Sequence, residues 1–77
     1  MRNLFELSKG QKCLIDKILS EDGMKRRLLD LGLTPNTIVE CVNISPHGDP
    51  KAFLIRGAVI ALRREDCQKI LIKEASL

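Results

Sequence analysis

Two short apolar runs, residues 51–55 (KAFLI) and 58–62 (AVIAL), stand on either side of the dipeptide Arg-Gly at 56–57. A two-residue turn at this dipeptide predicts a β-hairpin whose register places Leu54 opposite Val59. Because side chains alternate between the faces of a strand, both faces of the hairpin are apolar. One face carries Phe53, Ile55, Ile60 and Leu62, and the other carries Ala52, Leu54, Val59 and Ala61. The first face is expected in the core, and the second must be covered by this chain or by a partner.

The chain before the hairpin predicts one strand and one short helix. Residues 12–19 (KCLIDKIL) alternate in part between apolar and polar positions, which favours a strand. Ser20 or Asp22 is expected to cap the helix that follows. The apolar residues of this helix recur at helical spacing on one stripe that should face inward: Met24, Leu28 and Leu31.

Glycine and asparagine mark the turn after this helix. Gly32 suits the left-handed residue that ends many helices, and Asn36 suits a turn position with positive φ. Residues 37–44 (TIVECVNI) predict the next strand. The loop at 46–50 holds two prolines and one glycine, which restrict it to a fixed shape.

The remaining segments complete a small β domain. Residues 1–9 form an apolar lead-in that packs on the rest, residues 63–68 predict a helical turn, and residues 70–73 predict a last strand. About five short strands, with one helix inserted after the first, predict a mainly β fold: a small closed barrel. Closure is expected because it removes the edges that so short a sheet could not protect. We expect residues 1–77 to form one domain.

Composition limits the kinds of partner and the cellular compartment that we expect. The net charge is only +3, and the chain has no Trp, no Tyr and two Phe, so it lacks the aromatic platforms of single-strand nucleic-acid binders. No nucleic-acid partner is therefore expected. No apolar run approaches the ~20 residues that span a bilayer, which predicts a cytoplasmic protein that does not cross the membrane. Three widely spaced cysteines fit a reducing compartment.

Catalytic chemistry finds no support in the residue pattern. The only histidine, His47, lies in the loop at 46–50, and no Ser or Cys has an activating neighbour in sequence. The pattern predicts that the chain is not an enzyme. Metal binding is left open: His47, Asp49 and Cys41 are candidate ligands for iron or zinc, with neither a CxxC pair nor a second histidine to support them. The competing interpretation is a core cysteine and a solvated loop histidine.

Three segments in register carry a family likeness. Residues 27–35 (RLLDLGLTP), 46–50 (PHGDP) and 60–63 (IALR) together resemble the FeoA domain of bacterial ferrous iron transport. The chain departs from the family pattern at Asn36, where Gly is usual, and at Ser45, where Ala is usual. His47 stands where the family usually has an apolar residue, so it inherits no role from the pattern.

The resemblance implies a barrel similar to Src-homology-3 (SH3) domains and to the C-terminal module of iron-dependent repressors. It implies a non-enzymatic accessory protein of iron uptake that binds the cytoplasmic face of the ferrous iron transporter FeoB, with transition metal binding as a further possibility. The residues expected to bind this partner lie at the helix end, the rigid loop and the outer hairpin face: Arg27, Leu31, Gly32, Pro46, Gly48, Asp49, Pro50, Leu54, Val59 and Arg63.

Other classes remain open at this stage. Lys25, Arg26, Arg27, Arg63 and Arg64 would form a basic patch if the helix and the hairpin end were adjacent. Such a patch would suit an acidic protein surface or the anionic inner leaflet. A small basic barrel that binds RNA and a metal-sensing domain are the alternatives. The oligomeric state, and whether the chain activates or inhibits its partner, do not follow from the residues.

Overall fold

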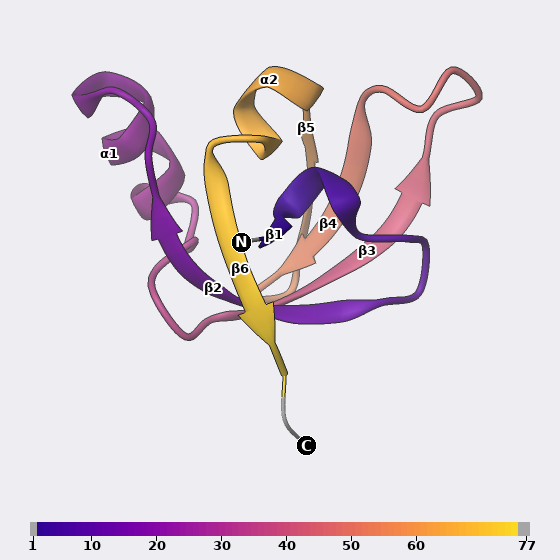
Figure 1. Cartoon of the computed structure of the whole chain (residues 1–77), viewed down its shortest axis with the longest axis horizontal. Coiled ribbons are helices and arrows are strands. Elements are labelled where there is room, and N and C mark those ends of the chain that lie inside the picture. Colours follow the sequence, from indigo (N-terminus) through magenta and orange to yellow (C-terminus); the bar gives the residue numbers. More distant parts are fainter. Residues whose placement is uncertain (1, 76–77) are drawn as a thin grey trace.

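A six-stranded antiparallel sheet with strand order β1-β6-β2-β3-β4-β5 organises the structure, a computed structural model that describes residues 2–75 (Figure 1). The strands are β1 (Arg2–Asn3), β2 (Lys12–Ile18), β3 (Ile38–Ile44), β4 (Lys51–Ile55), β5 (Ala58–Leu62) and β6 (Ile70–Glu74). The helices are the 3-10 turn η1 (Leu4–Glu6), α1 (Asp22–Asp30) and α2 (Arg64–Cys67). The predicted mainly β architecture is confirmed, and so is a helix after the first long strand, which is β2.

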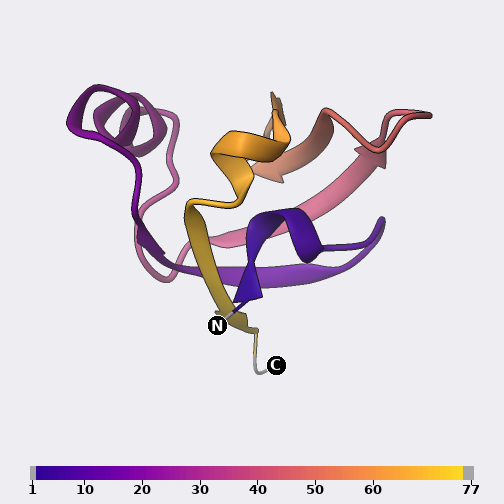
Figure 2. The same ribbon diagram turned by 45° about the horizontal axis from the view of Figure 1, so that its top comes forward.

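The sheet curls strongly, and η1 and α2 lie over its concave side while α1 stands at one flank (Figure 2). Two features differ from the expectation of a closed five-stranded barrel. A sixth strand, β1, pairs with β6 through Arg2 and Asn3, and two residues are too few to show a strand period in sequence. The described ladder also has two ends, β1 and β5, so β5 keeps one unpaired side.

The β4–β5 hairpin has the predicted register throughout, from Lys51 opposite Leu62 to Ile55 opposite Ala58. Arg56 and Gly57 both have positive φ, at 48° and 84°. Two central residues with positive φ define the turn whose twist matches that of the flanking strands. The Arg-Gly dipeptide therefore makes a tight turn even though arginine rarely occupies this region.

The core lies on the concave side of the sheet. Phe53 is at 0% exposure among aliphatic side chains from β2, β3, β6 and the helices. The other fully buried hydrophobic side chains are Leu4, Leu7, Ile15, Leu28, Leu33, Val39, Cys41, Ile55, Cys67 and Ile70. Leu4 and Leu7 confirm that the amino-terminal segment packs on the rest, although Met1 lies outside the described residues.

Helix α1 ends before the left-handed Gly32 as predicted, but it differs from its prediction in its cap and in its inward stripe. Its N-cap residue is Glu21, which makes no side-chain capping bond, so neither Ser20 nor Asp22 caps it. Of the predicted inward stripe, Leu28 is buried, Met24 is half-buried and Leu31 is 37% exposed. The helix leans against the flank of the sheet rather than over its centre, so its last turn stays partly open to solvent.

The outer hairpin face is not sealed by the rest of the described chain. Val59 is 64% exposed, Ala61 is exposed, and Leu54 and Ala52 are half-buried. Because Leu54 and Val59 are direct cross-strand partners, they form a small apolar surface on the convex side of the sheet.

Candidate partner-binding groove

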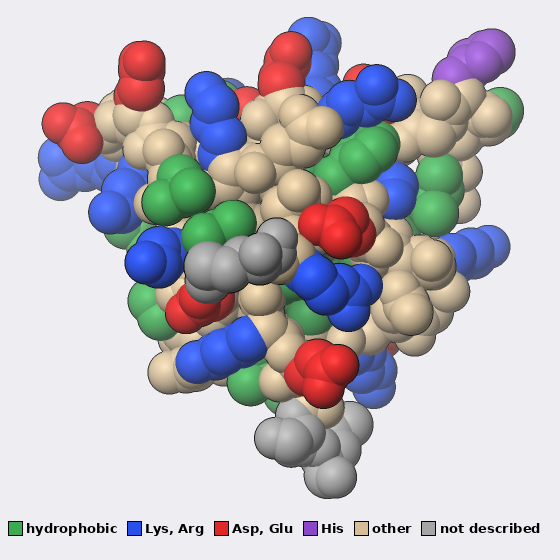
Figure 3. All heavy atoms as spheres, in the orientation of Figure 1, with side chains coloured by type: hydrophobic (Ala, Val, Ile, Leu, Met, Phe, Trp, Pro, Cys, Tyr) green, Lys and Arg blue, Asp and Glu red, His purple; other side chains and the backbone are tan. Residues whose placement is uncertain are grey.

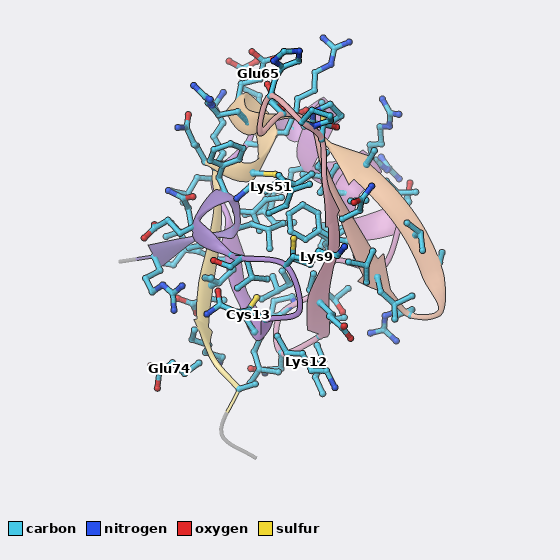
Figure 4. All side chains as sticks on the ribbon, turned by 90° about the vertical axis from the view of Figure 1, so that its right-hand side faces the viewer. Lys9, Lys12, Cys13, Lys51, Glu65 and Glu74 are labelled. Carbon is cyan, nitrogen blue, oxygen red and sulfur yellow. The ribbon has the colours of Figure 1, made fainter. Side chains whose placement is uncertain are left out.

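A groove of about 440 Å³ runs between α1, β5 and the start of α2. Its lining mixes apolar and charged side chains, and more of its exposed surface is polar than apolar. Helix α1 contributes Met24, Arg27, Leu28 and Leu31; β5 contributes Ile60, Ala61 and Leu62; and Arg63, Glu65 and Asp66 complete it. Glu65, on α2, is labelled in Figure 4. The volume falls in the range of ~300–1,000 Å³ that is typical of ligand pockets.

The Arg56 side chain links the hairpin turn to the end of α1. Its Nε donates to the Gly32 carbonyl at 3.2 Å, and its Nη2 donates to the hydroxyls of Thr34 and Thr37 at 3.0 and 3.2 Å. Thr34 and Thr37 also share a hydroxyl hydrogen bond of 2.8 Å. We call Arg56 with these three partners the arginine clamp. It fixes the position of the α1 wall relative to β5.

The loop at 46–50 is held against the other end of the groove. The Arg64 backbone N–H donates to Asp49 Oδ1 at 2.9 Å, which occupies one free donor at the start of α2. Within the loop, the Gly48 N–H donates to the Ser45 carbonyl at 2.7 Å. Gly48 has a φ of 83°, a value that favours glycine. The predicted rigid loop is therefore tied by hydrogen bonds to the rim of the groove.

Cations gather around Phe5 on the neighbouring surface. Lys51 Nζ lies 4.3 Å and Arg64 Cζ 5.0 Å from the ring centroid. Lys51 Nζ also donates to the carbonyls of Phe5 and Leu7, the latter at 3.0 Å, and Figure 4 shows it directed toward η1. Sequence reasoning did not pair these residues because 46 positions separate Phe5 from Lys51. These contacts hold η1 onto the hairpin.

The structure gathers some of the predicted partner-binding residues and separates others. Arg27, Leu31 and Arg63 line the one groove, and Gly32 lies directly behind its α1 wall, against Arg56. The loop residues Pro46, Gly48, Asp49 and Pro50 reach the groove only through the contact of Asp49 with α2. Leu54 and Val59 lie on the convex side of the hairpin.

The groove also contains residues that the sequence did not predict to bind a partner. Met24 and Ile60 were assigned to the core, yet both are half-buried and form part of the groove wall. Glu65 and Asp66 add negative charge at the rim. Of the five residues of the expected basic patch, Arg27 and Arg63 line the groove, whereas Lys25, Arg26 and Arg64 do not. Figure 3 accordingly shows basic and acidic side chains interspersed over this view of the molecule.

The three candidate metal ligands are not assembled into a site. Cys41 is fully buried and its thiol faces the Asn43 carbonyl at 3.8 Å, whereas His47 is exposed at the loop tip, as the purple side chain of Figure 3. Within residues 2–75 no group of three or more His, Cys, Asp or Glu side chains is placed to hold a metal ion. The proposed set of His47, Asp49 and Cys41 therefore does not fit iron or zinc.

All three cysteines are free and buried. Burial raises the pKa of the Cys13 thiol to about 11 and that of Cys67 to about 12, and it also raises the pKa of Cys41. Neutral thiols are poor metal ligands and poor nucleophiles. The cysteines thus act as small core residues.

A curled antiparallel sheet of this topology, with a helix inserted after its long first strand, belongs to the SH3-like class of small β domains. The FeoA domain family matches residues 2–74, and the chain belongs to this family, which is involved in ferrous iron transport. The predicted family and fold are confirmed. No helix within residues 2–75 has the length and apolar character needed to cross a membrane.

Solved structures agree in fold over nearly the whole chain. FeoA from Chlorobium tepidum is 27% identical with a TM-score of 0.91, covering 97% of this chain and 71% of that one. FeoA from Stenotrophomonas maltophilia, solved in complex with zinc, is 22% identical with a TM-score of 0.85, covering 95% and 91%. It is described as an SH3 domain protein possibly acting as a ferrous iron transport activating factor. A manganese-dependent transcriptional repressor shares the fold at 16% identity and a TM-score of 0.84, covering 96% of this chain and 41% of that one.

One curated relative joins two proteins in a single chain. The Fe(2+) transport protein A/Fe(2+) transporter FeoB fusion protein of Porphyromonas gingivalis is 29% identical over 70 residues. The match covers 91% of this chain and only 8% of the fusion protein. In that relative, a domain similar to this chain is part of the same polypeptide as FeoB.

Proposed function

We propose that this chain is a cytoplasmic accessory protein of ferrous iron uptake that docks on the cytoplasmic face of a FeoB-like transporter. The observation that carries the proposal is the groove between α1, β5 and α2, where apolar residues such as Leu31 and Ile60 line one hollow together with Arg27 and Arg63. The fusion protein supports the choice of partner, because covalent linkage in one species indicates a working association between the two parts.

The groove is preorganised for binding. The arginine clamp fixes the α1 wall, and the Asp49 contact with the Arg64 N–H fixes the loop beside α2. A surface that already holds its bound shape loses less conformational entropy on association. Arg27 and Arg63 would speed the encounter with an acidic surface more than they would tighten the complex. We propose that residues 1–77 act as one docking domain without catalysis of their own.

Replacing an apolar side chain with a polar one tests the groove as the docking site. Leu31→Ser removes a groove side chain that is 37% exposed, so its effect on folding should be small. We expect at least about tenfold weaker retention of the FeoB-like transporter from detergent extracts on immobilised protein. Leu19→Ser is the matched control, because Leu19 is 58% exposed and does not line the groove.

A charge reversal tests the rim. Arg63→Glu should lower the association rate and its salt dependence, whereas Arg26→Glu should change both less because Arg26 does not line the groove. Surface plasmon resonance at two salt concentrations measures the rates. If both groove variants bind the transporter as the wild type does, the groove is not the docking site. If the wild type does not bind at all, the proposed partner is wrong.

A further inference from the structure

Strand β5 has a free side, since the described ladder ends there. In a hairpin closed by a two-residue turn, the residues next to the turn exchange both hydrogen bonds, and bonded and unbonded pairs then alternate. Ile55 and Ala58 close this turn, so Ala58, Ile60 and Leu62 direct their backbone groups to β4. Val59 and Ala61 therefore direct their N–H and C=O groups away from β4, toward the free side.

These four backbone groups have no partner in the described part of the chain. None of the turn, loop or capping hydrogen bonds within residues 2–75 involves Val59 or Ala61. The strand also lacks the devices that usually protect an edge, since residues 58–62 (AVIAL) contain no charge and no proline. A short apolar edge with outward backbone donors and acceptors is a template for one more strand.

The groove lies beside the Ala61 end of this edge. Ala61 lines the groove together with Ile60 and Leu62 of β5, and Met24 and Leu28 of α1 stand across from them. An added strand would direct alternate side chains toward the groove and toward the convex face, where Val59 is 64% exposed. The same segment could thus use backbone bonds for affinity and side-chain contacts with the groove and the convex face for specificity.

Positive charge at both ends of β5 favours one kind of added strand over another. Arg56 precedes the strand, and Arg63 and Arg64 follow it. Two copies of this chain paired through antiparallel β5 strands would place Arg56 of each copy close to Arg63 and Arg64 of the other. Like charges so placed are destabilising. A foreign strand with acidic residues at its ends would instead face arginine at both ends.

We infer that β5 accepts, by strand addition along the groove, an extended apolar segment of the transporter bounded by acidic residues. This inference rests on the proposed function and names the type of contact that it uses. It places the main-chain groups of Val59 and Ala61 in direct hydrogen bonds with the partner.

One substitution removes an outward donor without touching the β4 pairing. Ala61→Pro eliminates the N–H that faces the groove, and proline is tolerated in edge strands when its missing N–H lies on the free side. Ala61→Ser is the matched control because it keeps the N–H. We expect Ala61→Pro to weaken retention of the full-length transporter about tenfold or more, since it removes a bond and places a ring in the path of the strand. Ala61→Ser should stay within about twofold of wild type.

Amide hydrogen exchange on the wild-type protein gives a second readout that does not depend on the variant folding. Adding the detergent-solubilised transporter should slow exchange at Val59 and Ala61. Exchange rates at these two amides that do not change in the complex overturn strand addition. Equal retention of the Pro and Ser variants overturns it as well, while leaving the proposed function intact. A transporter that the wild type fails to retain overturns both.

The oligomeric state of the isolated protein tests whether a partner strand or a second copy of this chain occupies the β5 edge. A monomer in analytical ultracentrifugation at micromolar concentration supports a foreign strand. A dimer that Ala61→Pro dissolves would show that a second copy occupies the edge, and would overturn the choice of occupant.

Discussion

At Gly32, both the backbone conformation and a close contact with Arg56 require glycine. Its φ is +103°, and a Cβ built there would lie 2.8 Å from Arg56 Cδ. The backbone conformation alone was predictable, because glycine at a helix end is the usual left-handed residue. The contact with Arg56 was not, since 24 positions separate the two residues. Asn36, at φ 68°, was likewise predictable as a residue that tolerates positive φ.

Gly32→Ala should destabilise the protein by about 1 to 3 kcal/mol, because alanine is strained at this φ and its methyl group displaces the Arg56 side chain. Urea denaturation measures the effect. Gly10→Ala is the control, since Gly10 has a φ of +88° but open space around its Cα. We expect about 1 kcal/mol there. Equal losses at the two sites would mean that the contact with Arg56 adds nothing.

The buried cysteines predict a loss of stability in alkali. The folded-state pKa is raised from the ordinary value of 9.0 to about 11 for Cys13 and about 12 for Cys67. Above pH 9 the unfolded chain loses thiol protons that the native chain keeps, so stability falls as pH rises toward the folded pKa. Between about pH 8 and pH 10, we expect the free energy of unfolding to drop by about 1 to 3 kcal/mol.

Urea denaturation at both pH values checks this slope, and Cys67→Ala provides the comparison. Although that variant starts from a lower stability, it should show a weaker dependence on pH because one of the three buried thiols with a raised pKa is gone. A slope that does not change in Cys67→Ala would assign the pH dependence to other groups.

At the scale of elements, the local sequence pattern predicted the β4–β5 hairpin correctly but the start of α1 wrongly. The apolar runs around Arg56 predicted the hairpin and its register, because a two-residue turn leaves only one way to pair the strands. The cap of α1 was predicted wrongly: Ser20 and Asp22 are both suitable residue types, but the helix begins after Glu21. Small shifts in where a helix begins depend on tertiary packing, which local propensity does not contain.

The arginine clamp should be separable from the turn that carries it. Arg56→Asn removes the side-chain bonds to Gly32, Thr34 and Thr37 yet supplies a residue that favours positive φ before Gly57. We expect faster amide exchange at residues 32–37 by roughly tenfold, with little change in the β4–β5 amides. Uniform acceleration across the hairpin would show instead that Arg56 supports the whole fold.

The convex face of the hairpin is a second surface whose role can be tested. Replacing Leu54 and Val59 together with serine should lower the melting temperature by only a few degrees, roughly 1 kcal/mol, because Val59 is 64% exposed and Leu54 half-buried. Retention of the transporter should be lost if an added strand uses this face. A folded double variant that binds normally would restrict docking to the groove side.

At the scale of the whole molecule, the curl of the sheet determines which chemistry is possible. It brings Arg27, Leu31 and Arg63 around one groove and leaves Cys41 and His47 apart, one in the core and one at a loop tip. The sequence could propose all five residues as functional but could not state which of them meet. Proximity of this kind depends on strand order, which the sequence pattern only suggests.

The separation of the metal candidates predicts a null result in a thermal melt. If the protein had one metal site, free metal at a concentration of about 100 times its Kd would stabilise the fold by about 2.7 kcal/mol. The melting temperature would then rise by more than about 10 °C. We expect the curves with zinc chloride, with ferrous iron under anaerobic conditions and with chelator to coincide within about 2 °C. A rise that saturates at one equivalent and disappears in His47→Ala would contradict this geometry.

By itself, the sequence determined most of what depends on neighbours along the chain: the longer strands, the helix segments, the left-handed Gly32 and Asn36, the hairpin register and the family motif. These follow from residue conformational preferences and from the two-residue and 3.6-residue periods. Only the tertiary structure decided that β5 is an unpaired edge, that α1 leaves a groove beside it, and that Arg56 joins the two. Such features arise from contacts between segments distant in sequence, whose geometry is set by how the sheet curls and which strands meet.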